Sequence, residues 1–146
     1  MSIKDVEPSV LIKTMAGKME KMKEFQPPEW SKFVKTGVSR QRPPIQKNWW
    51  FLRSASILRK VYLEPGVGVN RLSKVYGGRK NRGHKPEHKA VGSTKILRAS
   101  IQQLERAGLL EAKVEKKKNV GRKISKKGLD FIKDAEHLLG KGASKP

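Results

Sequence analysis

The side chains best suited to chemistry in this sequence are Lys and Arg, which gather in four separate segments. A cation that neutralises a phosphate releases condensed counterions, so clusters of cations are typical of nucleic-acid binding. A single surface Lys or Arg is usually only solvated, and the prediction therefore rests on the clusters. The residues predicted to bind nucleic acid are Trp49, Arg53, Arg59 and Lys60; Arg79, Lys80, Arg82 and Lys85; Lys95, Arg98 and Gln102; and Lys116, Lys117, Lys118, Arg122 and Lys123.

The overall charge agrees with a polyanionic partner. The chain has 34 Lys and Arg against 13 Asp and Glu, a formal net charge of +21 on 146 residues. Self-repulsion of this size disfavours a compact free chain, and a polyanion relieves it. An anionic membrane is the weaker candidate, because no stretch approaches the roughly 20 apolar residues of a spanning helix. Residues 1–7 also lack the apolar core of a secretory signal.

No pattern in the sequence indicates catalysis, a cofactor or a metal. The absence of cysteine excludes a disulfide framework and a Cys-based zinc site. There is no acidic pair, no Ser/His/Asp set and no Cys nucleophile, and Gly77-Gly78 is not followed by the Gly-Lys-Ser/Thr of a P-loop. His84 and His88 lie four residues apart, but Pro86 stands between them and no third ligand is near. We therefore expect neither an enzyme nor a metal protein.

The N-terminal third predicts a helix and an irregular segment. Pro8 suits the first position of a helix over 8–23, with an apolar face of Leu11, Met15, Met19 and Met22 that we interpret as core packing. Pro27 and Pro28 interrupt the chain, after which one or two helical turns over 29–36 would be anchored by Trp30, Phe33 and Val34. We expect Trp30 to belong to the core. Residues 37–44 are irregular and basic, with Arg40 and Arg42 beside a proline pair.

The strongest helical pattern covers 48–63. Asn48 is a plausible N-cap, and an apolar stripe recurs at near-helical spacing: Phe51, Ala55, Leu58 and Tyr62. A second stripe carries Trp49, Arg53, Ser56 and Lys60. We expect Trp50 to be buried and Trp49 to pack beside Arg53 at the surface.

Between this helix and the next, the chain becomes polar. A turn over 64–68 leads to a short helix over 69–76, with Leu72, Val75 and Tyr76 expected to point inward. Residues 77–89 have almost no apolar content and are too long for an ordinary connection. This segment is either a mobile surface loop or an arm that becomes ordered on RNA. We favour the arm because its charge is one-sided, with Glu87 as its only acid.

The last third predicts a helix, a hairpin and a final helix. The helix over 92–107 has an apolar stripe of Leu97, Ile101 and Leu104, with Lys95, Arg98 and Gln102 opposite, so Arg98 should be exposed. Gly108 is a suitable residue to end it. Strands over 110–115 and 122–124 flank a polar tip at 116–121, and Ser125 caps a helix that reaches 139.

Three helices followed by a two-stranded hairpin is the order of a winged helix-turn-helix. We therefore predict a mainly α fold with an N-terminal helical segment (1–47), a winged-helix domain (48–139) and a basic tail (140–146). The helix over 92–107 occupies the recognition position and the hairpin forms the wing. In DNA-binding relatives the recognition helix enters the major groove, whereas on A-form RNA shape and phosphate contacts dominate.

Three functions were weighed on this basis. A DNA-binding regulator usually needs a dimer surface, but the chain has no zipper or effector domain, and we expect no homo-oligomer. Its charge also extends well beyond one recognition face. An enzyme acting on RNA lacks a catalytic set. A structural protein bound to folded RNA agrees best with cations spread over several elements.

Several motifs, in order along nearly the whole chain, resemble the archaeal and eukaryotic small-subunit ribosomal protein nineteen-e family. They are the run 48–56 (Asn-Trp-Trp-Phe-Leu-Arg-Ser-Ala-Ser) with Arg59 and Tyr62; Val75-Tyr76-Gly77-Gly78-Arg79; Gly83, Pro86 and His88; Gly92-Ser93, Arg98 and Leu104-Glu105; and Gly121-Arg122-Lys123. The spacing is similar to that of the archaeal branch.

The resemblance implies a winged-helix fold with an added N-terminal helical segment. It implies a place in the head of the small ribosomal subunit, in the cytoplasm, with rRNA and neighbouring ribosomal proteins as partners. It also implies a role in the maturation of that subunit. Arg53, Arg59 and Arg98 match the basic surface on which assembly depends in this family.

Overall fold

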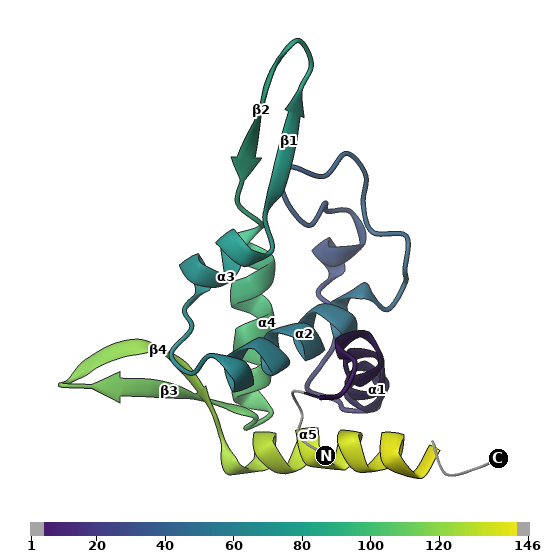
Figure 1. Ribbon diagram of the computed structural model, residues 1–146, viewed down its shortest axis with the longest axis vertical. Helices are drawn as coiled ribbons and strands as arrows, with labels where there is room; N and C mark the ends of the chain where they lie inside the picture. The colour runs from purple at the N-terminus through teal and green to yellow at the C-terminus, as the bar shows by residue number, and fades with distance from the viewer. Residues whose placement is uncertain (1–4, 143–146) are drawn as a thin grey trace.

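The computed structural model describes residues 5–142 and places five α-helices and two antiparallel hairpins in one body (Figure 1). The elements in chain order are α1 (Pro8–Glu20), a 3-10 turn η1 (Glu29–Lys32), α2 (Trp49–Leu63), α3 (Val69–Val75), β1 (Gly78–Arg82), β2 (Lys85–Ala90), α4 (Thr94–Arg106), β3 (Leu110–Glu115), β4 (Lys118–Ile124) and α5 (Lys126–Gly142). The fold is mainly α, as predicted. The order α2, α3, α4, β3, β4 is compatible with a winged helix, but the structure has a second hairpin that was not predicted.

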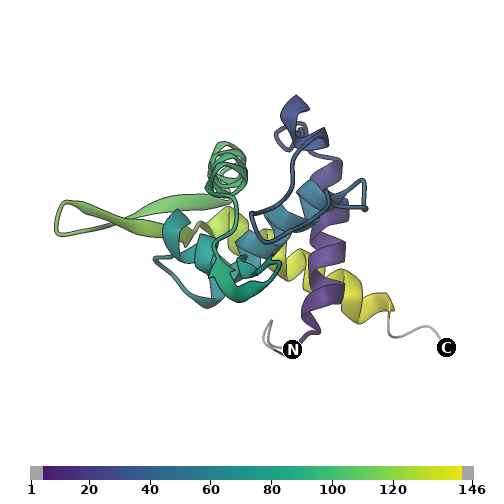
Figure 2. The same cartoon turned by 90° about the horizontal axis from the view of Figure 1, so that it is seen from above.

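Helix α2 lies at the centre of the hydrophobic core, in contact with α1, α4, β4 and α5. Figures 1 and 2 show α1 and α5 packed beside it at one end of the molecule. Because α2 is covered from several sides, its buried face is wider than the predicted stripe. Trp50, Ala55 and Leu58 are buried as expected, but Phe51 and Tyr62 are only partly buried, and the other buried positions are Ser54, Ile57 and Val61. Asn48 occupies the N-cap position without a capping hydrogen bond.

Helix α1 begins at Pro8, as predicted, and contributes its methionine stripe to the same core. Leu11, Met15 and Met19 are fully buried, which confirms the interpretation of these residues as core. The helix ends at Glu20, three residues earlier than expected. The chain turns there and buries Phe25, so that Met22 lies beyond the helix and is only partly buried.

The segment after α1 is less buried than the sequence indicated. Phe33 is 82% exposed, so it is not an anchor. Trp30 is partly buried at the edge of the core, where its ring packs edge-on against Trp50 with centroids 5.6 Å apart. The indole N–H of Trp50 donates to Gln103 Oε1 at 2.8 Å, and Gln103 Nε2 donates to the Gln26 carbonyl at 2.7 Å. Trp50 and Gln103 therefore join the N-terminal segment, α2 and α4.

Residues 77–89 are not a structureless loop. They form most of the hairpin β1–β2, in which Gly78 lies opposite Ala90 and Arg82 opposite Lys85, with a shift of register between Lys80 and Arg82. Hydrophobic alternation could not predict these strands, because they contain almost no apolar residues, β1 is only partly covered at Gly78 and Lys80, and β2 is exposed along almost its whole length. At the tip, Asn81 Oδ1 accepts the Gly83 N–H at 2.9 Å. The preceding helix α3 also differs in part, since Val75, expected inward, is 50% exposed.

Helix α4 and the second hairpin follow the sequence closely. Leu97, Ile101 and Leu104 are buried as predicted, and the helix is followed by Gly108 with a φ of +74°. Strand β3 has the predicted bounds, but β4 is longer than expected and begins at Lys118, with Leu110 opposite Ile124 and Glu115 opposite Lys118. The predicted tip of six residues is therefore a turn with only two central residues, Lys116 and Lys117.

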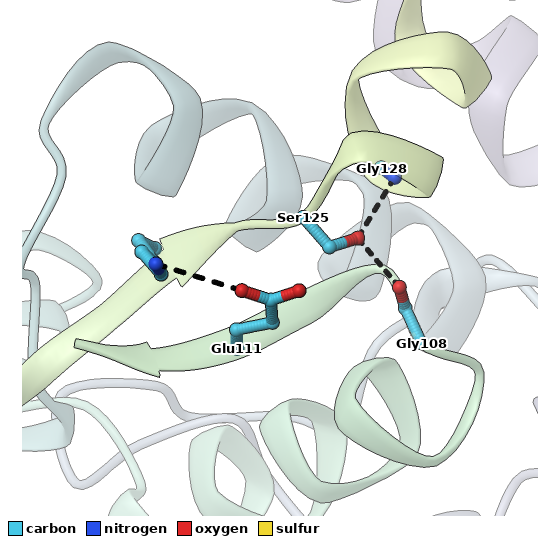
Figure 3. Close-up of polar contacts among 5 residues, drawn as sticks. Gly108, Glu111, Ser125 and Gly128 are labelled. Atoms are coloured by element: carbon cyan, nitrogen blue, oxygen red, sulfur yellow. Dashed lines mark hydrogen bonds and ion pairs between the residues drawn. The ribbon is translucent and has the colours of Figure 1, made fainter.

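Helix α5 is fastened at its start by Ser125, the cap that the sequence predicts. The Ser125 hydroxyl donates to the Gly108 carbonyl at 2.5 Å and accepts the Gly128 N–H at 3.0 Å (Figure 3). Gly128 allows the first turn of α5 to approach the backbone at Leu109. A Cβ at Gly128 would lie 2.3 Å from the Leu109 carbonyl oxygen. The helix continues to Gly142, past the predicted end at Leu139, and residues 143–146 of the predicted tail lie outside the described residues.

Gly128→Ala should destabilise the protein although alanine is the better helix former. The methyl group would push α5 from Leu109, and overpacking of this kind costs about 1–3 kcal/mol. The matched control is Gly17→Ala in α1, where a Cβ meets nothing within 4 Å and helix propensity should add about 0.5–1 kcal/mol. Urea unfolding, followed by circular dichroism, measures the free energy of unfolding of both variants. A stabilised Gly128→Ala variant would contradict the close approach.

Ser125→Ala should lower the free energy of unfolding by about 1–3 kcal/mol, because it removes an N-cap and a buried donor. The control is Ser93→Ala at the start of α4, where the hydroxyl accepts the Ile96 N–H at a longer 3.5 Å and the loss should be smaller. Thermal unfolding of both variants gives the comparison. If both variants lost the same free energy of unfolding, the hydrogen bond from Ser125 to the Gly108 carbonyl would contribute nothing to stability.

Candidate nucleic-acid interface

The predicted residues on α2 form a partly buried face. Trp49, Arg53, Arg59 and Lys60 are each intermediate in exposure. Trp49 packs against Trp50, with ring centroids 5.4 Å apart and an interplanar angle of 78°. The Arg53 guanidinium lies 4.3 Å from the centre of the Tyr76 ring, and the Tyr76 and Ser56 hydroxyls are hydrogen-bonded at 2.6 Å. Arg53 is thus held in place by Tyr76, the residue that follows α3, so its packing and its charge cannot be separated by a simple truncation.

The electrostatics of this face favour an anion. Burial lowers the pKa of Arg53 from its usual value; the Tyr76 phenol opposes this, and the charge of Arg40 adds to it. Burial also raises the pKa of Tyr76, which keeps the phenol neutral beside the guanidinium. Two guanidinium groups that repel one another are stabilised when a phosphate or carboxylate lies between them. The α2 face therefore has the charge and the donors to bind an anionic group.

The hairpin β1–β2 carries a second set of cations. Arg79, Arg82 and Lys85 are exposed and Lys80 is partly exposed. Arg79 is paired with Lys89, and Arg82 with Lys85, so like charges lie opposite one another along the ladder. Such pairs are destabilising, and a two-stranded hairpin is only marginally stable by itself. In Figure 1 the hairpin extends away from the helices, so its charge is accessible from both faces.

The predicted face of α4 lies between the two hairpins along the chain. Lys95, Arg98 and Gln102 are all exposed at i, i+3 and i+7, which places them on one side of the helix. The exposure of Arg98 agrees with the prediction for this residue. The Lys95 ammonium lies 4.7 Å from the centre of the Trp30 ring, so this lysine is held against the N-terminal segment. Arg98 and Gln102 are the more accessible members of the face.

The hairpin β3–β4 divides its cations into two groups. Lys116, Lys117 and Lys118 at the turn are exposed. Arg122 is instead ion-paired with Glu105 of α4, and Lys123 is paired with Glu111 on the opposite strand at 3.6 Å (the latter pair appears in Figure 3). Arg122 therefore fastens the hairpin to α4, Lys123 pairs the two strands of the hairpin, and the exposed lysines lie at the tip.

The turn itself is unusual for its residue types. Lys116 and Lys117 have φ of 47° and 64°, the left-handed values that a type I′ hairpin turn requires and that Asn-Gly normally supplies. Left-handed backbone costs a non-glycine residue about 1–2 kcal/mol. The two adjacent lysines thus place positive charge at the tip of the wing, at positions where Asn and Gly would make the folded protein more stable.

Three cations near α2 were not among the predicted site residues. Arg40, Arg42 and Lys13 line a hollow shared with Trp49 and Arg53. The signal for Arg40 and Arg42 was present, since the sequence marks 37–44 as basic and irregular. Nothing in the local pattern shows that this segment returns to α1 and α2, because that placement depends on tertiary packing.

Within residues 5–142 no three His, Cys, Asp or Glu side chains are grouped as a metal site would require. No helix in the same range is long and apolar enough to span a membrane.

Known proteins are similar to this chain over most of its length. The family described as Ribosomal protein S19e matches residues 2–139. "Small ribosomal subunit protein eS19" of Thermoplasma volcanium is 41% identical over 92% of this chain and 87% of its own length. The protein of the same name from Aeropyrum pernix is 43% identical, over 88% and 82%. The relative eS19B of Schizosaccharomyces pombe is 40% identical, over 88% and 87%. This chain therefore belongs to the Ribosomal protein S19e family.

Proposed function

We propose that this protein is a structural constituent of the small ribosomal subunit, located in its head, that binds rRNA and assists the maturation of the subunit. The observation that carries the proposal is the arrangement of cations in a member of a ribosomal-protein family. They are exposed on α4, on β1–β2 and at the tip of β3–β4, and partly exposed on α2. In Figures 1 and 2 the two hairpins extend from the body in different directions. Such a surface suits an RNA that folds around the protein.

The unit α2–α4 with β3–β4 is proposed to be a winged helix, with α4 at the recognition position. On A-form RNA a recognition helix contacts phosphates and riboses, because the major groove is too deep and narrow for side chains to read. A DNA-binding regulator would concentrate its charge on α4 and the wing, whereas here β1–β2 and α2 are charged as well. The sixteen predicted contact residues are retained in this proposal, with Arg122 and Lys123 assigned to holding the wing in position.

Membership of a ribosomal-protein family indicates a structural, non-enzymatic protein. The partners proposed here are small-subunit rRNA and neighbouring ribosomal proteins, in the cytoplasmic ribosome. Within this proposal the N-terminal segment (1–47) packs on the winged-helix unit, since α1 residues belong to the same hydrophobic cluster as α2, α4 and α5.

Arg98→Ala should impair incorporation into small subunits without loss of the fold, because Arg98 is exposed and has no packing role. Combined with Lys95→Gln, it should reduce the salt slope of binding to small-subunit rRNA by about 1.4–1.8, the equivalent of two phosphate contacts. The measurements are sucrose-gradient sedimentation of subunits and filter binding at several salt concentrations. The charge-matched control is Lys126→Gln with Lys133→Gln, two exposed lysines of α5 outside the predicted set. Normal incorporation of the Arg98 variant would refute its role.

The turn of the wing gives a second test, in which stability and RNA binding should change in opposite directions. Lys116→Asn with Lys117→Gly should raise the free energy of unfolding by about 1–2 kcal/mol through relief of left-handed strain and should weaken rRNA binding. Lys116→Gln with Lys117→Gln removes the same charges but keeps the strained backbone, so it should weaken binding without a gain in stability. Unaltered binding by both variants would show that the tip does not contact RNA.

A further inference from the structure

A hollow of about 820 Å³ lies between α1, the segment 36–46 and the N-terminal half of α2. This volume is within the range of about 300–1,000 Å³ that is usual for small-molecule sites. Residues of α1 line it together with the segment 36–46 and the start of α2, which directly follows that segment. The proposed contacts of α4 and the two hairpins do not use it.

The lining of the hollow combines cations with apolar surface. Lys13, Arg40, Arg42 and Arg53 contribute the charge, and none of the described residues that line it is acidic. Trp49 and Leu52 contribute an aromatic ring and an aliphatic side chain to the same wall. An occupant must therefore present an anionic group and a flat or apolar group within one small volume.

Two of these side chains are fixed before any ligand arrives. Arg53 is held against Tyr76, which is itself hydrogen-bonded to Ser56. Trp49 is held edge-on by Trp50. Burial, with a contribution from Arg40, lowers the pKa of Arg53, so a negative charge placed here would relieve an existing electrostatic cost. Pre-organised donors and aromatic rings reduce the entropy lost on binding.

We propose that the hollow receives one unpaired ribonucleotide of the bound RNA, with its base against Trp49 and its phosphate between Arg40, Arg42 and Arg53. The proposal rests on the proposed function, RNA binding, and assigns to this hollow the recognition of an unpaired nucleotide. Bases that leave a helix are commonly recognised by stacking on aromatic rings and guanidinium planes. An acidic peptide has matching charge, but it presents a flat ring to Trp49 only where an aromatic residue lies beside its carboxylates, whereas every nucleotide carries a base and a phosphate together. Under the proposed function, the other basic surfaces would contact phosphates, and such contacts alone would not distinguish a bulge from a paired segment.

The test compares three kinds of short RNA hairpin bound to the full chain at one salt concentration. One kind carries a single bulged A, C, G or U, the second has the same bulge without its base, and the third is fully paired. Stacking of one base is expected to make at least one bulged RNA bind about fivefold to 150-fold more tightly than its abasic equivalent.

Two variants assign this preference to the hollow. Trp49→Leu should abolish the difference between the bulged and abasic RNAs, and Trp49→Phe should retain most of it. Because Trp49 also packs on Trp50, a second variant away from the core is needed. Arg42→Gln, at an exposed position, should reduce the preference for bulged over paired RNA. Arg106→Gln on α4 removes an equal charge outside the hollow and should leave the preference unchanged.

The outcomes separate this proposal from the proposed function. Equal affinity for bulged, abasic and paired RNA, with a normal salt slope, would overturn the nucleotide site and leave rRNA binding intact. Failure to bind any RNA, including small-subunit rRNA, would contradict the proposed function itself. If a Glu-rich peptide containing Phe bound in a Trp49- and Arg42-dependent way while the RNAs were not distinguished, the hollow would belong to a protein partner and the proposal would be wrong.

Discussion

The packing of α2 against its neighbours is the interaction on which the rest of the structure depends. A chain with a formal charge of +21 repels itself, and little apolar material is available to oppose that repulsion. The apolar side chains of α1, α4 and α5 converge on α2 in one cluster. Trp50 adds a polar link through Gln103 to the carbonyl of Gln26. Because these contacts are made by helical stripes, the cations remain on the outer faces of the same helices.

The charged projections rely on this body because they have no core of their own. Hairpin β1–β2 places like charges opposite one another, and β3–β4 turns through two lysines with left-handed backbone. Both features cost stability in the free protein, and under the proposed function bound phosphates would offset that cost. The ion pair of Arg122 with Glu105 of α4 holds the wing to the body at its base, and the pair of Lys123 with Glu111 joins the two strands of the wing. A rigid body with costly, charged extensions is consistent with a protein that reaches its final stability within a ribonucleoprotein.

Sequence reasoning was reliable where an element packs against the core. The structure agrees with the apolar stripes predicted for α1 and α4, because these depend on local periodicity. It also agrees with the start of α1 at Pro8 and the cap at Ser125, because these depend on local backbone geometry and local hydrogen bonds. It failed at β1–β2, because strands exposed on both faces have no hydrophobic alternation. It also misjudged Phe33 and Val75, which are apolar but lie largely outside the core. For such residues the type alone does not reveal exposure.

By itself, the sequence determined the sign and clustering of the charge, the helices with a buried face, and the absence of cysteine chemistry, because these depend on composition and short-range spacing. The resemblance to a ribosomal family was also visible in its motifs. Only the tertiary structure decided which cations are free and which are paired, since Glu105 and Arg122 come together through the packing of α4 and β4. Only the tertiary structure likewise brought Lys13, Arg42 and Trp49 around one hollow, because their proximity is created by long-range packing that no local pattern records.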